Sequence, residues 1–526
     1  MIVQVLAVAV LMVGWLSTRE PVHGGRGSGG ADRLFCCAVA CVPLLQLVPL
    51  PPSLFATVGG RELVREAGQL AEALDGWVPV SVSTRATLLG FLAGLPAIAV
   101  FWCVSSLGTR QRRALSLWVL IVGAVSVFVG LLQVAQGPSS ALRFYSITNP
   151  SEAVGFFANR NHFSALLYTL LLLTAAWAVQ ALRAFARAPA KARLEAGILL
   201  PMFSTFALLV ILMAAQTFTR SRAGLALMIV ALLLASLLAI GRRGDGQQSS
   251  TGFRLILGAG TLGIVMAIQF ALYRILERFE ADPLADARIP FARNTLEAVW
   301  GSLPWGTGLG TFVPVYGGVE RAADALMDTF ANRAHNDFLE VWLETGVAGV
   351  SLGAVFAIWL LVRSSGVWRR VEGRADIDVL LPRAASVAIV LLLAHSLVDY
   401  PLRTTALLAL FAFCCALLVP VAGDVEPADA RQARRPRVTP ASPGPSMDPV
   451  AAPRRAAGVE WPVAPGVGAS PPMPNADRPS VGGQSGARWG QGIEWPAAWR
   501  SERGSDEPSD GDGRAPGPTR APGRKP

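Results

Sequence analysis

Long apolar stretches separated by short polar segments run through this chain up to about residue 421. Stretches of roughly 20 apolar residues, the length at which a helix crosses a bilayer, recur at about eleven places. A soluble chain of 526 residues with 52% hydrophobic and only 16% charged side chains could not bury so much apolar surface in one core. We therefore predict an all-α fold, a polytopic transmembrane helical bundle of about 11 or 12 spans. The expected spans centre on residues 2–17, 34–50, 87–107, 114–134, 163–181, 196–216, 223–241, 254–273, 338–362, 378–398 and 403–421.

The first stretch, residues 2–17, lacks the basic start and the small-residue cleavage site of a signal peptide, so we interpret it as a span. A twelfth span would lie upstream of it. The net charge of +10 comes mostly from arginines in short loops and in the tail, which predicts topology-setting charge and no nucleic-acid partner. The six cysteines all fall in apolar stretches without metal-ligand spacing, so we expect packing or lipid-facing residues and no metal site.

Basic residues gather in four short loops that alternate along the chain, at 110–113, 183–193, 242–254 and 363–374. Such loops stay on the cytoplasmic side of a bacterial inner membrane. The connections at 51–86, 136–162, 217–222, 274–337 and 399–402 are then periplasmic, and the long periplasmic loop 274–337 is the largest of them.

Composition changes at residue 422, where Pro, Gly, Ala, Arg and Asp replace the apolar runs. We expect a transmembrane domain over residues 1–421 and a disordered cytoplasmic tail over residues 422–526. Two related units, GVEWP and GIEWP, occur in the tail. They could dock an unknown cytoplasmic partner, or they could be drift in a low-complexity sequence.

Two polar motifs stand at expected periplasmic ends of spans. The first is GFFANRNHF from Gly155, in which Asn159 and Asn161 could cap a helix or form a donor array for a substrate. The second is TFTRSRAG from Thr217, which carries Arg220 and Arg222 in a tight turn between two apolar spans. Arginine is disfavoured on the outer side, so either an anionic ligand or lipid phosphate is expected at this turn.

The long loop carries a third set of polar residues. Residues 288–302 can form an amphipathic helix lying in the interface, with Ile289, Leu296, Val299 and Trp300 on its apolar side. The run GTGLG from Gly306 to Gly310, centred on Gly308, would let backbone approach a ligand closely. It follows no predicted strand, which excludes a nucleotide-binding fingerprint.

A histidine and two carboxylates mark the end of this loop. Neutral imidazole at His335 could take a proton from a hydroxyl, and Asn336 beside it could orient a substrate. Glu340 and Glu344 lie one turn apart at the start of a span, where carboxylates need a partner such as Arg333 or Arg288, or a wet cavity. The bland alternative is a polar anchor at the interface. In the later motif HSLVDYPLRT, we expect Asp399 and Arg403 to pair as a structural clamp.

Taken in order, the motifs GFFANRNHF, TRSRAG, Arg288 followed by LPWGTGLGTF, and AHNDFLEVWLETGVAG resemble the O-antigen ligase and polymerase superfamily of membrane glycosyltransferases. The resemblance covers residues 85–420. It implies a donor glycan linked to undecaprenyl pyrophosphate, moved on the periplasmic side to an acceptor hydroxyl in surface polysaccharide assembly, without metal, nucleotide or other cofactor. The acceptor would be lipid A–core for a ligase, another repeat unit for a polymerase, or a protein hydroxyl for a protein O-oligosaccharyltransferase.

By motif, the resemblance places the catalytic roles on His335, Arg288 and Arg222, with Arg220 as an alternative phosphate ligand. We add Asn159, Asn161, Asn336, Glu340, Glu344 and Gly308 as candidate substrate-binding residues. A flippase for lipid-linked glycans is the alternative from another class. It predicts charged residues near mid-span and an internal repeat, and the sequence shows neither clearly.

Overall fold

The computed structural model describes residues 2–17, 29–70, 76–239, 283–325, 330–369 and 377–421, and these are predominantly helical. The expected span at 254–273 and the tail 422–526, with its two Trp-containing units, lie outside the described residues. The prediction of a polytopic all-α membrane protein is confirmed. In the described part of the chain, the helices α5, α6, α7, α8, α13 and α14 are long and apolar enough to cross a membrane. Helices α9 and α15 are also apolar but shorter.

The other expected spans coincide with helices. These are α1 Ile2–Ser17, α2 Gly29–Gln46, α5 Thr84–Ser106, α6 Thr109–Gln136, α7 Arg160–Arg187, α8 Ala196–Thr219, α9 Arg222–Ala239, α13 Asp337–Arg369, α14 Ile377–His395 and α15 Thr405–Leu418. The short 3-10 helices η1 (Ala192–Leu194) and η2 (Pro401–Arg403) lie in the connections before α8 and α15.

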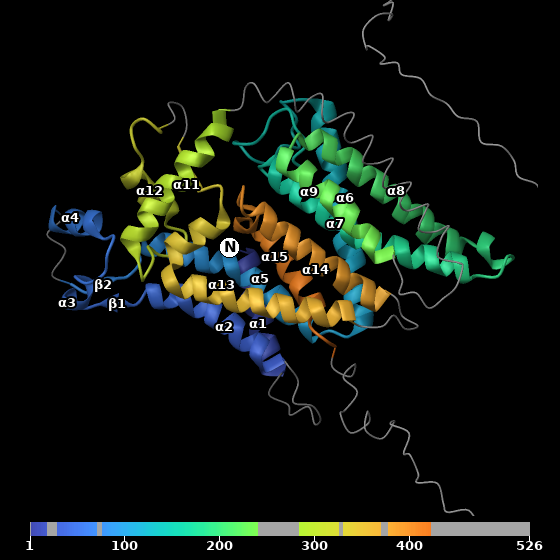
Figure 1. Cartoon of the computed structure of the whole chain (residues 1–526), viewed down its shortest axis with the longest axis horizontal. Coiled ribbons are helices and arrows are strands. Elements are labelled where there is room, and N and C mark those ends of the chain that lie inside the picture. The colour runs from blue at the N-terminus through green and yellow to red at the C-terminus, as the bar shows by residue number, and fades with distance from the viewer. Residues whose placement is uncertain are drawn as a thin grey trace, which may run out of the picture. The chain divides into compact units, whose positions relative to one another are not determined.

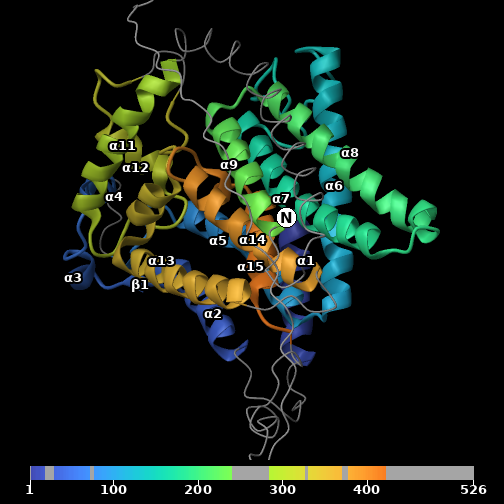
Figure 2. The same ribbon diagram turned by 45° about the vertical axis from the view of Figure 1, so that its right-hand side comes forward.

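Helix α7 is an interior element of the bundle, packed against α6, α8, α9 and α14 (Figures 1 and 2). In its most apolar window 72% of the residues are buried, as in α14, whereas in α8 only 11% are. A helix that is apolar on every side is expected in the interior of a bundle. Helix α8 turns most of its apolar surface outward, as a lipid-facing helix does.

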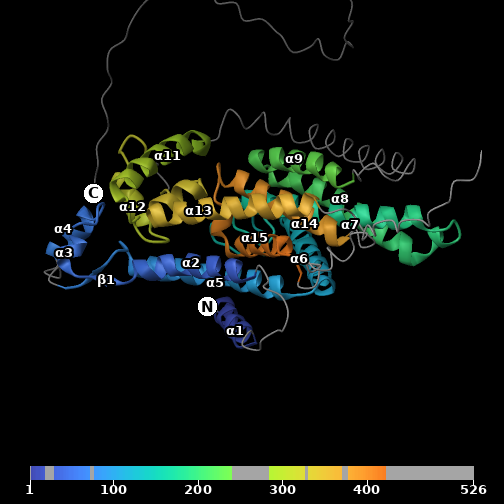
Figure 3. The same cartoon turned by 60° about the horizontal axis from the view of Figure 1, so that its bottom comes forward.

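A second group of helices surrounds α5, which packs against α1, α2 and α15 (Figure 3). Helix α2 also packs on α13, and a buried carboxylate joins the two. Asp32 accepts a hydrogen bond from the Trp359 indole at 2.8 Å and from Arg363 Nη2 at 2.8 Å. An unpaired carboxylate in an apolar layer is costly, so these partners account for its burial.

Arginines also bind the bundle together at the end where α6 and α14 begin. Arg113 donates two hydrogen bonds to the Asp378 carboxylate and so joins the starts of α6 and α14. Arg112 donates to the carbonyls of Ser105 at 2.7 Å and Val419 at 2.6 Å, which ties the α5–α6 turn to the end of α15. Two arginines expected in a loop therefore belong to the first turns of α6.

The two long connections at the other end have structure of their own. The segment between α2 and α5 holds α3 (Pro52–Phe55), α4 (Glu62–Leu70) and a two-stranded antiparallel sheet of β1 (Pro49–Leu50) and β2 (Val78–Pro79), with Pro49 opposite Pro79. The segment before α13 holds α11 (Pro283–Ser302) and α12 (Phe312–Val319). Arg61 joins the two segments: fully buried, it donates to Val80 O at 2.8 Å and Gly306 O at 2.6 Å, and burial lowers its pKa to about 10.

Helix α11 confirms the helix expected at 288–302, but its apolar residues divide between two sides. Val299 is buried with Phe291 against α13, whereas Ile289, Leu296 and Trp300 are exposed. Ile289, Leu296 and Trp300 share one exposed side of the helix, and its expected position in the membrane interface stays a prediction. Tertiary packing selects the Phe291 side as the internal one, because Asn294 and Thr295 on that side find hydrogen-bond partners.

Helix α13 is broken at Gly346, and the glycine-rich turn fits into the break. Gly346 adopts φ +59°, a conformation that disfavours side chains with a Cβ. Thr307 N and Gly308 N donate to the carbonyls of Leu343 and Glu344, each at 2.9 Å, and Val347 N donates to Pro304 O at 2.9 Å. The turn thus satisfies backbone groups that the break leaves without helical partners.

We predict that Gly346→Ala lowers stability by about 1–3 kcal/mol, because a Cβ there would lie 2.1 Å from Pro304 O and the positive φ adds strain. The measurement is the melting temperature of the purified protein in detergent. Gly353→Ala is the matched control in the same helix, since a Cβ at Gly353 meets nothing within 4 Å. Equal melting temperatures for the two variants would contradict the role given to the break.

Candidate functional site

Polar residues from several distant segments meet where α7 and α13 begin and α14 ends. The ring of Tyr400, which follows α14, contacts His162 of α7 at a centroid distance of 4.8 Å and His335, just before α13, at 5.0 Å. Asp337 N donates to Ser396 O at 2.9 Å and fixes the start of α13 against the end of α14. Motifs that are more than 200 residues apart in sequence therefore form one cluster.

His335 is held between aromatic rings and beside a carboxylate. Its ring stacks on Phe291 of α11 at 6.0 Å and meets Tyr400 edge-on. Its Nδ1 lies 3.3 Å from Asp399 Oδ1, and 15% of its side chain remains exposed. The residue adopts φ +52°, an unfavourable conformation for a non-glycine residue that these contacts must stabilise. The imidazole is thus oriented with its Nδ1 edge toward Asp399.

Asp399 is fully buried and surrounded by three of the four histidines in the sequence. Burial alone would raise its pKa, but the contact with His335 and the electrostatic influence of His162 and His395 hold that pKa below its ordinary value of 3.8. The carboxyl group is therefore charged at neutral pH. A charged carboxylate beside one ring nitrogen fixes the orientation of a histidine ring.

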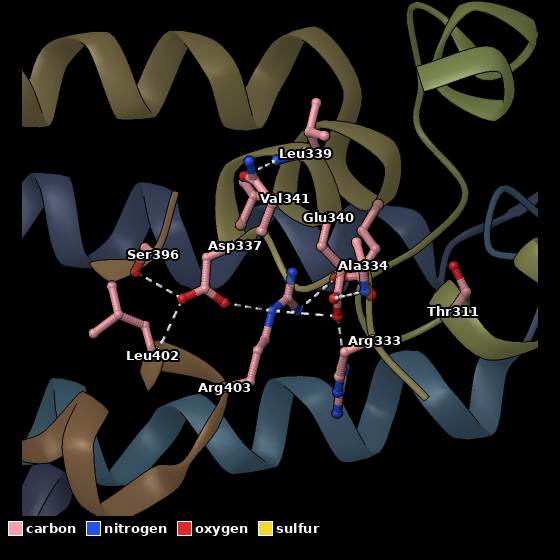
Figure 4. A network of polar contacts seen from close by, with 12 residues as sticks. Thr311, Arg333, Ala334, Asp337, Leu339, Glu340, Val341, Ser396, Leu402 and Arg403 are labelled. Atoms are coloured by element: carbon pink, nitrogen blue, oxygen red, sulfur yellow. Dashed lines mark hydrogen bonds and ion pairs between the residues drawn. The ribbon is translucent and has the colours of Figure 1, made fainter. Parts of the chain in front are cut away.

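Arg403 lies at the centre of a buried ionic cluster, here called the Arg403 cluster (Figure 4). Its guanidinium donates to Glu344 Oε2 at 2.6 Å and lies 3.4 Å from Glu340 and 3.5 Å from Asp337. Burial would lower the pKa of Arg403, but the three carboxylates outweigh it and raise that pKa. The cluster ties the first two turns of α13 to η2.

The remaining bonds of the Arg403 cluster shape the segment that carries His335. Glu340 accepts from Arg333 Nη1 at 2.7 Å and from Ala334 N at 3.1 Å, while Asp337 accepts from Ser396 Oγ at 2.8 Å (Figure 4). The two residues before His335 are thus fixed by a carboxylate of α13. The expected Asp399–Arg403 clamp was wrong: Asp399 contacts His335, and Arg403 binds the carboxylates of α13.

Three candidate substrate ligands have intramolecular partners. Glu340 and Glu344 are completely buried in the Arg403 cluster. Asn336 caps α13, since its Oδ1 accepts from Phe338 N and Leu339 N, and its Nδ2 donates to Leu397 O at 3.0 Å. Their contacts position His335 and the start of α13.

The side of Gly308 on which a Cβ would stand faces other atoms of the protein. A Cβ on Gly308 would lie 2.5 Å from Ser81 Oγ and 2.7 Å from Thr87 Oγ1, at the start of α5. The close backbone approach expected at this glycine exists, but the approaching group is α5. A ligand at Gly308 stays a prediction.

Asn159 and Asn161 stand at the beginning of α7. Asn159 is its N-cap, with Oδ1 accepting from Asn161 N at 2.8 Å, so the capping interpretation is confirmed. Its side chain also reaches the Tyr400 hydroxyl, as does that of Asn332. Asn161 is half-buried one residue before His162.

The three candidate phosphate-binding arginines are all partly exposed. Arg220 and Arg222 lie at the α8–α9 turn, where Arg220 adopts a left-handed conformation with φ +50°. Phe218 O in this turn accepts from Ala153 N at 3.0 Å, which connects it to the segment before α7. Arg288 of α11 lies one turn before Phe291, which stacks on His335, and it is close enough to His395 to act on it electrostatically.

The glycine of the TRSRAG motif has a packing role. A Cβ on Gly224 would fall 1.7 Å from Ser164 Oγ of α7, so this residue lets α9 and α7 approach closely. Ser221 caps the start of α9 through its Oγ, which accepts from Gly224 N at 3.1 Å. The motif therefore sets the position of Arg222 through helix packing.

Across the residues that the structure describes, no three His, Cys, Asp or Glu side chains form a group suited to hold a metal ion. The sequence had indicated His335 but had not connected it to Asp399, Tyr400 or Asp337. Asp399 follows His335 by 64 residues (399 − 335) and stands in a motif that we expected to be structural. The pair becomes visible only in the folded structure, where the segment before α13 lies against the segment after α14.

We predict that Arg403→Met lowers stability by about 3–5 kcal/mol, because three buried carboxylates lose their shared cation. The measurement is chemical or thermal unfolding in detergent. Arg321→Met is the control: Arg321 pairs with Glu297 at 2.8 Å on the surface, and its loss should cost less than about 1 kcal/mol. Similar losses for both variants would show that the Arg403 cluster does not hold α13 to η2.

Comparison with known proteins agrees with the resemblance of the motifs. Residues 206–368 match the family model described as O-antigen ligase. The matched segment contains Arg220, Arg222, Arg288 and His335, and it ends before Asp399, Tyr400 and Arg403. No curated protein matches the chain. The expected resemblance is confirmed: over residues 206–368 this membrane protein is similar to the O-antigen ligase family.

Proposed function

We propose that the protein transfers a glycan from a polyprenyl-pyrophosphate-linked donor to an acceptor hydroxyl, with His335 as the general base. The observation that carries this proposal is the His335–Asp399 contact at 3.3 Å, in a chain whose residues 206–368 match the O-antigen ligase model. A partly exposed imidazole oriented by a buried carboxylate is suited to accept a proton from a hydroxyl.

The proposed reaction is a direct displacement. The acceptor oxygen attacks the anomeric carbon, the bond from that carbon to the pyrophosphate oxygen breaks, and the hydroxyl proton passes to His335 Nε2. Nδ1 is turned toward Asp399, so Nε2 is the nitrogen left for the acceptor. Attack from the side opposite the leaving group inverts the anomeric configuration.

Arginines supply the second requirement of the reaction, which is a fixed positive charge for the departing pyrophosphate. Arg288 lies one turn before Phe291, which stacks on His335, and it acts electrostatically on His395, whereas Arg222 and Arg220 stand at a separate turn. Guanidinium groups bind phosphate oxygens in pairs and do not need to reorganise as charge develops. We assign Glu340, Glu344 and Asn336 to positioning His335, since their contacts fix the residues around it.

We further propose that the site faces the periplasm, that the lipid is undecaprenyl and that the tail is cytoplasmic. The alternation of basic loops supports this orientation. The three versions of the function, ligase, polymerase and protein O-oligosaccharyltransferase, differ in the acceptor. Deleting the gene and measuring the length of surface polysaccharide distinguishes two of them: unattached full-length polymer on its lipid indicates a ligase, and single repeat units indicate a polymerase.

The roles of His335 and Arg288 are tested by glycan transfer in proteoliposomes. We expect His335→Gln to lower the rate by about 10²–10⁴-fold, the contribution of a general base, and Arg288→Ala by about 10²-fold or more. Arg293→Ala is the matched control, because Arg293 lies on the same helix but binds Asp324 at 2.8 Å on an exposed side. Near wild-type transfer by His335→Gln and Arg288→Ala, with normal membrane expression, would refute the assignment.

Asp399 is tested by its effect on stability as pH changes. Its folded-state pKa is below the ordinary 3.8, so its stabilising contribution is complete above about pH 4 and is lost as pH falls below that value. We therefore expect the melting temperature of wild type to exceed that of Asp399→Asn by a constant amount between about pH 5 and pH 8 and to approach it below about pH 4. A difference that persists unchanged in acid would contradict a charged Asp399. Transfer by Asp399→Asn should also fall, by up to about 10⁴-fold, because the carboxylate that orients the base is lost.

A further inference from the structure

The segment 137–159 between α6 and α7 folds back along α6. Gly155 N donates to Gln133 Oε1 at 2.9 Å, and Phe156 N donates to Ser126 Oγ at 3.2 Å. Ser126 lies ten residues (136 − 126) before the last residue of α6, which is about 15 Å along a helix that rises 1.5 Å per residue. The chain around Phe156 therefore lies beside the middle of α6, well away from the C-terminal end of that helix.

That level is inside the apolar part of α6. The apolar sequence of this helix continues to Val134, eight residues (134 − 126) and about 12 Å beyond Ser126. Non-helical backbone at this depth in a membrane requires partners for its polar groups. Gln133 supplies them: its amide donates to Leu142 O and Gly155 O, each at 2.8 Å, and accepts from Val154 N and Gly155 N.

Charged side chains of the segment bind within it. Arg143 donates to Asn149 O at 2.7 Å and Glu152 O at 3.1 Å. The buried Glu152 carboxylate pairs with Arg160 Nη1 at 3.0 Å, and Asn149 Oδ1 accepts from Arg160 N. The charged side chains of the segment thus have partners inside the protein, while Ser139, Ser146 and Ser151 are exposed.

Its large apolar side chains point the other way and form what we call the loop patch: Phe144, Tyr145, Ile147 and Phe156. They are 56%, 49%, 86% and 38% exposed, and the rings of Phe144 and Phe156 are in contact. A loop in water exposes polar groups and buries apolar ones. This segment pairs its charged groups internally and exposes four large apolar side chains, which is the arrangement expected where lipid replaces water.

The loop patch adjoins a helix that already has an exposed apolar surface. Trp118, Ile121, Val125 and Phe128 of α6 are all exposed and follow one another at helical spacing. In a membrane-spanning helix such a surface faces acyl chains. Lipid contact therefore continues from α6 to the segment that folds back beside it.

We propose that residues 137–159 form a re-entrant segment whose loop patch contacts the acyl chains of the bilayer. The segment inserts beside α6, is held there by Gln133 and Ser126, and brings Asn159 and Arg160 to the start of α7 from within the membrane layer. Through the Ala153–Phe218 bond it also sets the depth of the turn that carries Arg220. This inference does not depend on the proposed glycan transfer.

The test is photo-cross-linking in phospholipid nanodiscs. Benzoylphenylalanine is introduced at Phe156 and at Ile147, and at the exposed, ion-paired Arg321 as a control, and the adducts are located by mass spectrometry. We expect phospholipid adducts on acyl-chain carbons at the two patch positions and severalfold fewer adducts at Arg321. Adducts on headgroup atoms only, or no more lipid adduct than at Arg321, would overturn the proposal.

A pair of glutamine variants tests the anchor. Gln133→Ala removes the four hydrogen bonds that hold the segment, so acyl-chain adducts at Phe156 should decrease severalfold. Gln136→Ala, one turn later and exposed, removes only the bond from Ser140 Oγ near the start of the segment and should leave the adducts at Phe156 unchanged. Equal adduct yields in the two variants would show that Gln133 does not determine the depth of the segment, and the wild-type adducts report on that depth independently.

Discussion

The buried contact between Arg403 and the carboxylates of Asp337, Glu340 and Glu344 organises this end of the bundle. Three carboxylates on the first turns of one apolar helix would repel each other and could not be desolvated alone. One guanidinium from the turn before α15 makes their burial possible. In return the cluster fixes Arg333 and Ala334, and with them the backbone of His335. The geometry of His335, the proposed general base, thus depends on ion pairs that do not touch it.

The glycine-rich turn supports the same helix from the other side. It enters the break of α13 at Gly346, bonds to the carbonyls of Leu343 and Glu344, and is itself held by the buried Arg61. Gln46 at the end of α2 adds a bond to Glu344 O at 2.8 Å. Segments that looked like separate periplasmic loops in the sequence form one support for the start of α13. The glycines are required by close contact between protein segments.

Much of the architecture follows from local sequence. Apolar stretches of span length predict helices because an isolated backbone in lipid must satisfy its own hydrogen bonds. The helix at 288–302, the cap at Asn159 and the polar residues gathered at the ends of spans also follow from short patterns. The expected Asp399–Arg403 clamp was wrong, since proximity in sequence does not determine which segment packs against a side chain.

The apolar periodicity by itself therefore determined that this is a polytopic helical membrane protein, and the motif order determined its resemblance to O-antigen ligases. Only the tertiary structure decided that Asp399 contacts His335, that Glu340 and Glu344 pair with Arg403, and that the segment before α7 folds back along α6. The physical reason is that spans are specified by the free energy of transfer of consecutive residues, whereas a site is specified by long-range contacts that form when helix faces select their partners.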